Sequence, residues 1–341
     1  ENHTRGIDAV FNYGIFNFNA PNFILRFALG ETDYQLGVNS YERFAAEYHY
    51  LERDVWQQEL NLTPQEKERL IALLEENYRP ENRVYRYNFF YDNCATRPRD
   101  KIEESIDGKV IYPAEPQDGS LSFRDIVHQY CKGHPWARFG IDLCIGSEAD
   151  RPITQRQMMF APFYLMDAFA GAQIVHDSVQ RPLVSGKELI VDALPEEEEG
   201  GWMPTPFQCS LLLFILTAAA TIYSIRKRTG LWGVDLILFG AAGIVGCVLA
   251  FLALFSEHPA VSSNFLLLVF HPGQLLLLPY IIYCVRKGKK CWYLTLNLVV
   301  LTLFMVLFPL IPQRFDLAVV PLALCLLIRS ASNLILTSKK K

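Results

Sequence analysis

The chain has 341 residues, of which 51% are hydrophobic and 20% are charged, and its formal net charge is −4. The charge is divided near residue 206. Twelve Lys and Arg but only three acidic residues follow that point, which leaves 20 basic and 33 acidic residues before it. An acidic first part lacks the basic face that nucleic-acid binding requires, so this class of partner is excluded.

The first 80 residues predict strands, turns and helices in alternation. The opening segment is rich in aromatic and β-branched residues and is punctuated by Asn, Gly and Pro, which predicts strands and turns. Residues 41–60 predict a helix followed by an extended segment. The next helix has clear start signals, because Thr63 is an N-cap, Pro64 takes the first helical position and Glu66 completes a capping box.

The rest of the first part predicts a mixed α and β domain over residues 1–193. Residues 84–91 alternate enough to predict a strand, a helix is expected over about 97–106, and residues 121–180 read as mostly helical. Residues 194–206 are acidic and contain Gly and Pro, which is typical of a solvated linker.

Five apolar stretches follow, each close to the ~20 residues that cross the core of a bilayer. They are roughly 207–225, 231–255, 264–285, 291–311 and 316–336. Basic clusters follow the first, third and fifth stretches, which predicts that all three clusters lie in the cytoplasm. A membrane domain over 207–338 with five helices then places the first part on the opposite, extracytoplasmic side.

The first residues, ENHTRGID, are polar and contain no apolar segment of the kind a signal peptide needs. A translocated domain requires a translocation signal. We therefore expect that this sequence lacks its original N-terminus.

The eight cysteines divide between the two parts. Five lie in or beside the apolar stretches and predict small packing residues. The first part contains Cys94, Cys131 and Cys144, whose spacing does not match a zinc site, so no metal is expected. An oxidising compartment allows a disulfide between Cys131 and Cys144, and that pairing would leave Cys94 as the odd thiol.

Cys94 lies where the predicted strand gives way to the predicted helix. Backbone N–H groups and the dipole at a helix N-terminus favour a thiolate, and the same N–H groups can hold an oxyanion. Pro98 would distort the first turn if the helix began at Cys94 itself. A buried structural cysteine is the competing interpretation, and the spacing alone leaves both open.

A cysteine nucleophile needs a base, most often a histidine. The first part offers His3, His49, His128, His134 and His176, and none has a sequence context that marks it as the base. In the membrane part, His258 is expected on the extracytoplasmic side. His271 is expected at membrane depth, where an ionisable residue is a functional candidate.

Several segments carry a family likeness. They are FNYGIFNF at 11–18, the stretch 60–83, YNFFYDNCATRPRD at 87–100, PWARFGIDLCIGSEADR at 135–151 and the membrane segment 255–279. Together they resemble the Lnb-type lipoprotein N-acyltransferases, which are typical of Bacteroidota and some Gram-positive bacteria. The Asn-Cys pair at 93–94 also resembles the nucleophile segment of permuted papain-like enzymes. The resemblance implies a permuted papain-like α+β domain, outside the bacterial cytoplasmic membrane, followed by an all-α membrane domain of five helices.

The resemblance also implies an activity, which is intramolecular acyl transfer on a diacylglyceryl lipoprotein without a cofactor. Cys94 would attack the sn-2 ester, and the resulting thioester would pass its acyl chain to the α-amino group of the lipoprotein's cysteine, giving the lyso form. Asn93 is expected to assist the backbone N–H of Cys94 at the oxyanion. The resemblance implies a base in a Gly-His element upstream of residue 1, which His3 does not match.

Three further residues are expected to contact the lipoprotein or membrane lipid. Tyr91, with the aromatic run 89–91, predicts a lid that excludes water, although core packing explains at least two of these three rings. Arg97 is expected to contact a carbonyl or a lipid phosphate, or to pair with Asp100 along the helix. His258 is expected near the substrate or a lipid headgroup.

Two other classes of function stay open. A membrane-anchored papain-like hydrolase of peptide or cell-wall amides predicts an open, polar groove at Cys94 distant from the bilayer, whereas an acyltransferase predicts an apolar groove continuous with the membrane spans. A non-catalytic membrane protein that binds lipids or lipoproteins is the other class, because the sequence identifies no base.

Overall fold

The computed structural model describes residues 8–17, 21–113, 121–177, 179–193 and 203–338. Its chain forms two compact units. The first comprises Glu1–Ile126 and Pro152–Gly200, and the second comprises Val127–Arg151 and Gly201–Lys341. Most of the predicted linker, residues 194–202, and His3 lie outside the described residues.

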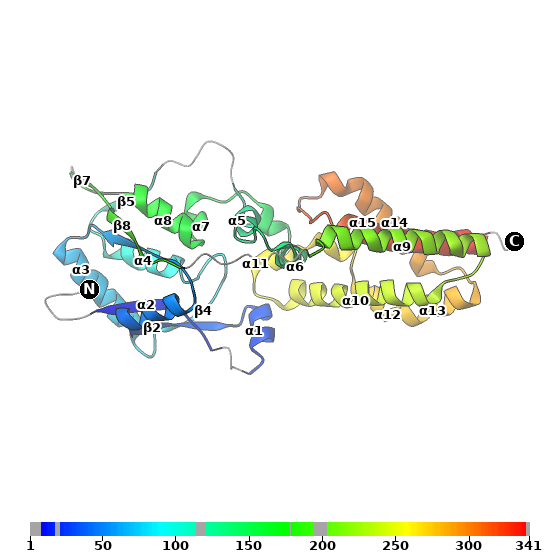
Figure 1. Ribbon diagram of the computed structural model, residues 1–341, viewed down its shortest axis with the longest axis horizontal. Coiled ribbons are helices and arrows are strands. Elements are labelled where there is room, and N and C mark those ends of the chain that lie inside the picture. The colour runs from blue at the N-terminus through cyan, green and yellow to red at the C-terminus, as the bar shows by residue number, and fades with distance from the viewer. Residues whose placement is uncertain (1–7, 18–20, 114–120, 178, 194–202, 339–341) are drawn as a thin grey trace. The chain divides into compact units, whose positions relative to one another are not determined.

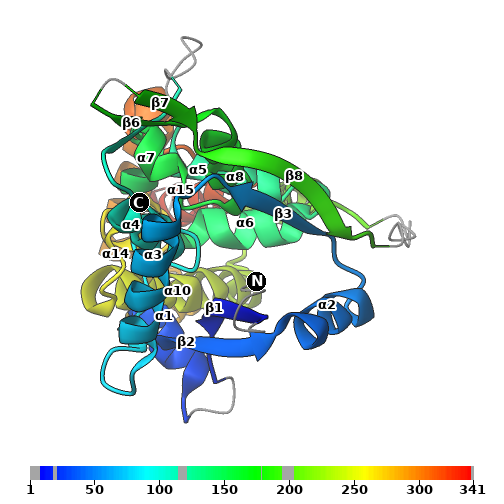
Figure 2. The ribbon, with the colours of Figure 1, turned by 90° about the vertical axis from the view of Figure 1, so that its left-hand side faces the viewer.

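The first unit contains three small antiparallel sheets, of which Figure 2 shows the β1–β2 and β3–β8 pairs as separate ribbons. The first sheet has the order β1-β2-β4, with bounds Ala9–Ile15, Asp33–Ser40 and Val84–Arg86. The second pairs β3 (Val55–Leu60) with β8 (Val184–Val191), and the third contains β5 (Lys109–Ile111), β6 (Gln173–His176) and β7 (Val179–Pro182). In the first sheet Tyr34 lies opposite Tyr85.

Helices surround these sheets, so the predicted α+β class of the first part is confirmed. They are α1 (Phe23–Leu29), α2 (Tyr41–Tyr50), α3 (Pro64–Tyr78), α4 (Thr96–Ser105), α7 (Gln155–Met158) and α8 (Pro162–Gly171). The helix α5 (Phe123–Tyr130) begins in the first unit and continues into the second. The capping box of α3 is formed as predicted, because the Thr63 Oγ1 accepts from the Glu66 N–H and the Glu66 carboxylate accepts from the Thr63 N–H.

Two local predictions in the first unit are wrong. The opening segment is not all strand and turn, because residues 23–29 form α1, which Gly30 ends with a left-handed φ of 78°. The strand predicted over 84–91 stops at Arg86. Asn88 and Asp92 exchange both backbone hydrogen bonds, at 2.9 and 3.0 Å, and this closes the chain between them into a tight loop.

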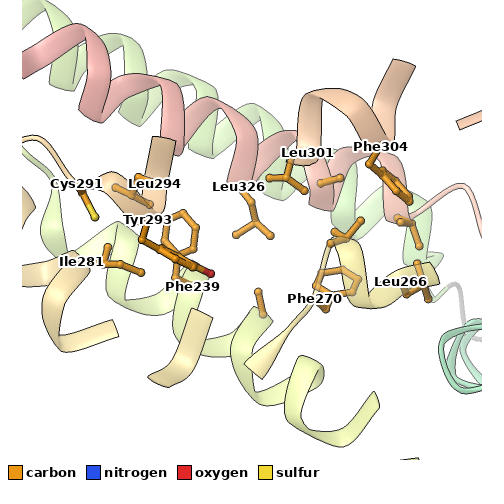
Figure 3. Close-up of a cluster of buried hydrophobic side chains, with 14 of the residues drawn as sticks. Phe239, Leu266, Phe270, Ile281, Cys291, Tyr293, Leu294, Leu301, Phe304 and Leu326 are labelled. Carbon is orange, nitrogen blue, oxygen red and sulfur yellow. The ribbon is translucent and has the colours of Figure 1, made fainter. Parts of the chain in front are cut away.

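The second unit is almost entirely helical. Among the residues that the structure describes, four of its helices are long and apolar enough to cross a membrane. They are α9 (Pro206–Lys227), α10 (Trp232–Phe255), α14 (Trp292–Leu307) continued by η3 (Phe308–Leu310), and α15 (Val319–Ser338). In Figure 1, α9 and α15 run side by side. Phe239, Leu301 and Leu326 belong to the apolar core between the helices, shown in Figure 3.

The third predicted stretch, 264–285, is not one continuous helix. It is divided into η2 (Phe265–Leu268), α12 (Pro272–Leu276) and α13 (Leu278–Lys287), and the short α11 (Pro259–Ser262) precedes it. Pro272 and Pro279 each lie in the first turn of a new helix, where the missing N–H costs nothing but cannot continue the previous helix.

The interrupted segment lies directly on the backbone of α10. A Cβ placed on Gly246 would lie 2.4 Å from the backbone nitrogen of His271, and one on Gly243 would lie 2.4 Å from that of Leu275. Small residues at such positions let two helices approach closely within a membrane. Irregular backbone is tolerated at membrane depth only where protein surrounds it or it lines a cavity.

The second unit also contains α6 (Pro135–Cys144) and η1 (Ser147–Asp150). Hydrogen bonds fix this segment to the loops between the membrane helices. The Gly146 N–H donates to the Ala260 carbonyl at 2.6 Å, and the Asn264 amide donates to the Leu143 carbonyl at 2.7 Å. Residues 127–151 therefore pack as part of the helical unit, although long stretches of the first unit flank them in the sequence.

Candidate functional site

Cys94 lies in the turn that leads into α4, two residues before the first residue of the helix. The Asn93 Oδ1 accepts hydrogen bonds from the Ala95 N–H at 2.8 Å and the Thr96 N–H at 3.0 Å, which satisfies donors that the helix start would otherwise leave free. The helix predicted over 97–106 is confirmed. Pro98 is its third residue, where an N–H has no intrahelical partner, so the distortion considered for this proline does not arise.

The Asn93 side chain is fully used within this turn. Its amide nitrogen donates to the Phe89 carbonyl at 2.8 Å and to the Phe160 carbonyl at 2.9 Å, and the residue is only 3% exposed. An amide group has two donor hydrogens, and both are engaged. These contacts do not agree with the expected role of Asn93 as an oxyanion donor. They fit a residue that positions Cys94.

Arg97 closes the same turn from the other side. Its guanidinium group makes two hydrogen bonds of 2.7 Å to the Asp92 carboxylate and stacks over the Tyr85 ring, with its carbon 3.9 Å from the ring centroid. The alternative pairing with Asp100 is wrong, because Asp100 accepts from Arg99 and Arg156 instead. Arg97 therefore connects the loop before Cys94 to the helix after it.

The tyrosines of the first sheet surround Cys94 on one side. A Cβ on Gly14 of β1 would lie 3.8 Å from the Cβ of Cys94. The rings of Tyr34 and Tyr87 stack with centroids 4.0 Å apart. Burial raises the pKa of Tyr34, Tyr85 and Tyr87, and a charge on Cys94 raises each further, so these phenols stay protonated at neutral pH.

The Cys94 thiol itself is not activated by the helix. Its side chain has solvent access, but protein atoms crowd the sulfur, and this burial raises the pKa of the thiol despite an opposing effect of the residue's own N–H. This burial opposes the thiolate-favouring effect expected of a helix start, and the helix begins two residues beyond Cys94. Among the described residues, no histidine contributes to the shift in this pKa. A separate base is therefore required to ionise the thiol.

Cys94 lies on the wall of a cavity of about 400 Å³ inside the first unit. Apolar side chains of three elements form most of the lining, and they include Phe44 and Tyr48 of α2, Trp56 of β3, and Leu165, Met166 and Phe169 of α8. The polar lining residues include Asp54 and Gln58, and the Gln58 amide nitrogen donates to the Met166 carbonyl at 2.8 Å. The sequence did not reveal this cavity, because its walls come from segments more than 100 residues apart.

The structure places the other predicted substrate contacts elsewhere. Tyr91 is 40% exposed, stacks edge-on against Phe123, and is not among the residues that line the cavity. Its neighbour Phe90 is a buried core residue, but Phe89 is 43% exposed, so the expectation that core packing explains at least two of the three rings is wrong. His258 lies in the second unit, where it is the N-cap residue of α11 and its N–H donates to the Ser256 Oγ.

Two remaining sequence predictions concern disulfides and metals. Cys131 and Cys144 are both free thiols, so the disulfide considered for them is not formed in this structure. Within the described ranges, no three His, Cys, Asp or Glu side chains gather in a way that could hold a metal ion.

These features define a class of protein, namely a multi-pass membrane protein with an α+β domain that presents a cysteine at an apolar cavity. Residues 1–118 match the family model of the Lnb N-terminal periplasmic domain, and residues 197–341 match that of the Lnb transmembrane domain. The chain belongs to the Lnb family, and its N-terminal domain is periplasmic. Searches of curated proteins and of solved structures found no match.

Proposed function

We propose that the protein is a lipoprotein N-acyltransferase that uses Cys94 as its nucleophile. The observation that carries this proposal is the position of the Cys94 thiol on the wall of an apolar cavity. A hydrolase of peptides or cell-wall amides would need polar groups along its groove, whereas an acyl chain needs only apolar contact. We also propose that the periplasmic domain is a permuted papain-like domain.

The proposed reaction exchanges an ester for an amide in two steps. A base takes the thiol proton, and the Cys94 sulfur attacks the sn-2 ester carbonyl of the diacylglyceryl-cysteine. The carbon–oxygen bond breaks, the glycerol oxygen takes up the proton, and a thioester remains on Cys94. The substrate's α-amine then attacks the thioester, the carbon–sulfur bond breaks, and the amine proton returns to the thiolate through the base. The product is an N-acyl, O-monoacyl lipoprotein.

The neighbouring residues support these steps in different ways. Asn93 and Arg97 hold the turn, so the sulfur keeps a fixed position during both attacks. The backbone N–H of Cys94 is the proposed oxyanion donor. The base implied by the family resemblance is a histidine, and the raised pKa of the Cys94 thiol explains why the reaction depends on it. The membrane helices would hold the lipid substrate, and His258 is a proposed contact for its headgroup.

The test expresses the gene in cells depleted of their own N-acylating enzyme and examines a reporter lipoprotein by mass spectrometry. Wild-type protein should give the N-acyl, O-monoacyl form, and Cys94→Ser should give none. Cys131→Ser is the matched control, because Cys131 is also a free thiol but lies in the other unit. Full product from Cys94→Ser would refute the nucleophile, and a cleaved peptide or cell-wall amide would favour the hydrolase instead.

A further inference from the structure

We propose that the cavity beside Cys94 is a pocket for the transferred acyl chain, and that the Leu165 and Met166 face of α8 limits the length of that chain. This inference rests on the proposed acyl transfer and adds a binding site with its ligand. It assigns the cavity to the acyl chain and leaves the glyceryl and peptide parts of the substrate outside.

The size of the cavity fits a fatty acyl chain. The volume of about 400 Å³ is many times the ~10–15 Å³ that one water molecule needs, so the cavity has room for a hydrocarbon chain of many carbons. The volume also exceeds what a small acyl group such as acetyl would fill.

The chemistry of the walls excludes the other parts of the substrate. No Lys or Arg is among the described residues that line the cavity, so nothing there would pair with a phosphate or a carboxylate. Two of the polar lining residues, Gln58 and Asp54, hydrogen-bond to the protein itself. Gln58 donates to the Met166 carbonyl, and the Asp54 carboxylate accepts from the Ala193 N–H at 2.8 Å. A hydrocarbon chain is the part of a lipoprotein that can be buried in such a site without losing hydrogen bonds to water.

The burial of the lining residues gives the cavity an outer and an inner end. Phe163 and Trp56 are 51% and 42% exposed, whereas Phe169 is 4% exposed. Phe169 belongs to a core cluster with Ile174 and Leu183, and Leu165 packs against that cluster. A chain that enters past the exposed rings and is esterified to the Cys94 sulfur would therefore end against the inner part of α8.

The first experiment measures chain length without relying on enzyme activity. Purified full-length protein is treated with N-alkyl maleimides of increasing chain length, and the rate of Cys94 modification is followed by mass spectrometry. The rate should rise with each added methylene, by up to about fourfold for the ~0.8 kcal/mol of a buried methylene. It should stop rising once the chain reaches the inner end of the cavity. A rate that is independent of chain length would overturn the acyl pocket.

Substitutions in α8 should move this limit. Leu165→Trp and Met166→Trp reduce the space and should lower the preferred length by about two carbons, whereas Leu165→Ala should raise it. Ile111→Trp is the control, because Ile111 is 52% exposed on β5 and does not line the cavity. An unchanged length limit in all three α8 variants would show that α8 does not limit the length of the chain.

The same variants separate this inference from the proposed function when the N-acyl chains of the reporter lipoprotein are measured in cells. Shorter N-acyl chains from Leu165→Trp and longer ones from Leu165→Ala support both proposals. If the variants give product with unchanged chain lengths, α8 does not limit the chain length, but the proposed transferase activity is retained. An absence of wild-type product refutes the transferase, and the maleimide series then decides whether the cavity still binds an alkyl chain.

Discussion

Arg97 and Asp92 in the periplasmic unit form a bidentate ion pair, as do Arg329 and Asp235 in the membrane unit. The two pairs differ in their exposure to solvent. The first pair has two hydrogen bonds of 2.7 Å with side chains that are 27% and 41% exposed. The second has hydrogen bonds of 2.7 and 3.0 Å with both side chains only 2% exposed. The geometry is nearly identical, so the difference in environment decides what each pair does.

The buried pair holds helices together. Arg329 belongs to α15, Asp235 to α10, and a third contact runs from Arg329 to the Thr221 Oγ1 on α9 at 3.2 Å. If either of these buried residues were replaced alone, the other would remain as a buried charge without a partner, which is strongly destabilising. The partly exposed pair of Arg97 and Asp92 contributes less energy because water reaches both partners. Its contribution is positional, since it fixes the loop that carries Cys94.

The largest effect is expected from Asp235→Ala. Removing one partner leaves the Arg329 guanidinium buried without a counterion, which costs about 3–5 kcal/mol. The free energy of unfolding of the detergent-solubilised protein should fall by that amount, whereas Asp92→Ala should change it by less than about 1 kcal/mol. The double variant Asp235→Leu with Arg329→Met should recover most of the loss. Equal effects of Asp235→Ala and Asp92→Ala would abolish the contrast between the two pairs.

A smaller but still clear effect is expected from Asn93→Ala. This variant compares a buried amide with an exposed one inside the periplasmic unit. The Asn93 amide makes four hydrogen bonds in a buried turn, and its loss leaves the partner N–H and carbonyl groups unpaired. We expect a loss of about 2–3 kcal/mol in the free energy of unfolding, since each unsatisfied buried group costs about 1–3 kcal/mol and relaxation recovers part of it.

The control for this prediction is Asn82→Ala. Asn82 is exposed, and its amide donates to the backbone carbonyl and the carboxylate of Glu76. Its substitution should change the free energy of unfolding by less than about 0.5 kcal/mol, which is usual for surface positions. An Asn93→Ala variant as stable as Asn82→Ala would mean that the turn does not depend on the amide.

The sequence predicted those features whose causes are local. The capping box of α3 needs residues three positions apart, and the start of α4 follows from the Asn-Cys-Ala-Thr order around position 94. The basic clusters between apolar stretches predicted a membrane domain because charge and hydropathy act on each segment separately. The interruption of the third stretch has a local cause too, because Pro272 and Pro279 divide its helix.

The candidate site was less predictable because it is made from distant segments. Cys94 was found from its own neighbours, but the cavity beside it needs α2, β3 and α8 to come together. The pKa of the thiol could not be inferred from its position near a helix, because burial and not the helix end controls it. Asn93 was assigned the wrong kind of contact, since sequence shows that an amide is present but not that four partners already surround it.

The smallest change in stability is expected from Arg97→Ala. This variant most directly separates the effect of Arg97 on the position of Cys94 from its effect on the free energy of unfolding. The free energy of unfolding should fall by about 0.2–1 kcal/mol. Formation of N-acyl lipoprotein should nevertheless slow by about tenfold, because a turn freed from Asp92 and Tyr85 no longer holds the Cys94 sulfur in one place. Arg79→Ala is the matched control, since Arg79 also pairs with an acidic residue, Glu76, at 2.8 Å and is 60% exposed. Arg97→Lys should behave like Arg97→Ala because an ammonium group cannot replace the planar fork. If Arg97→Ala transferred acyl chains at the wild-type rate, the exposed pair would have no positional role, and Asn93 alone would fix the turn.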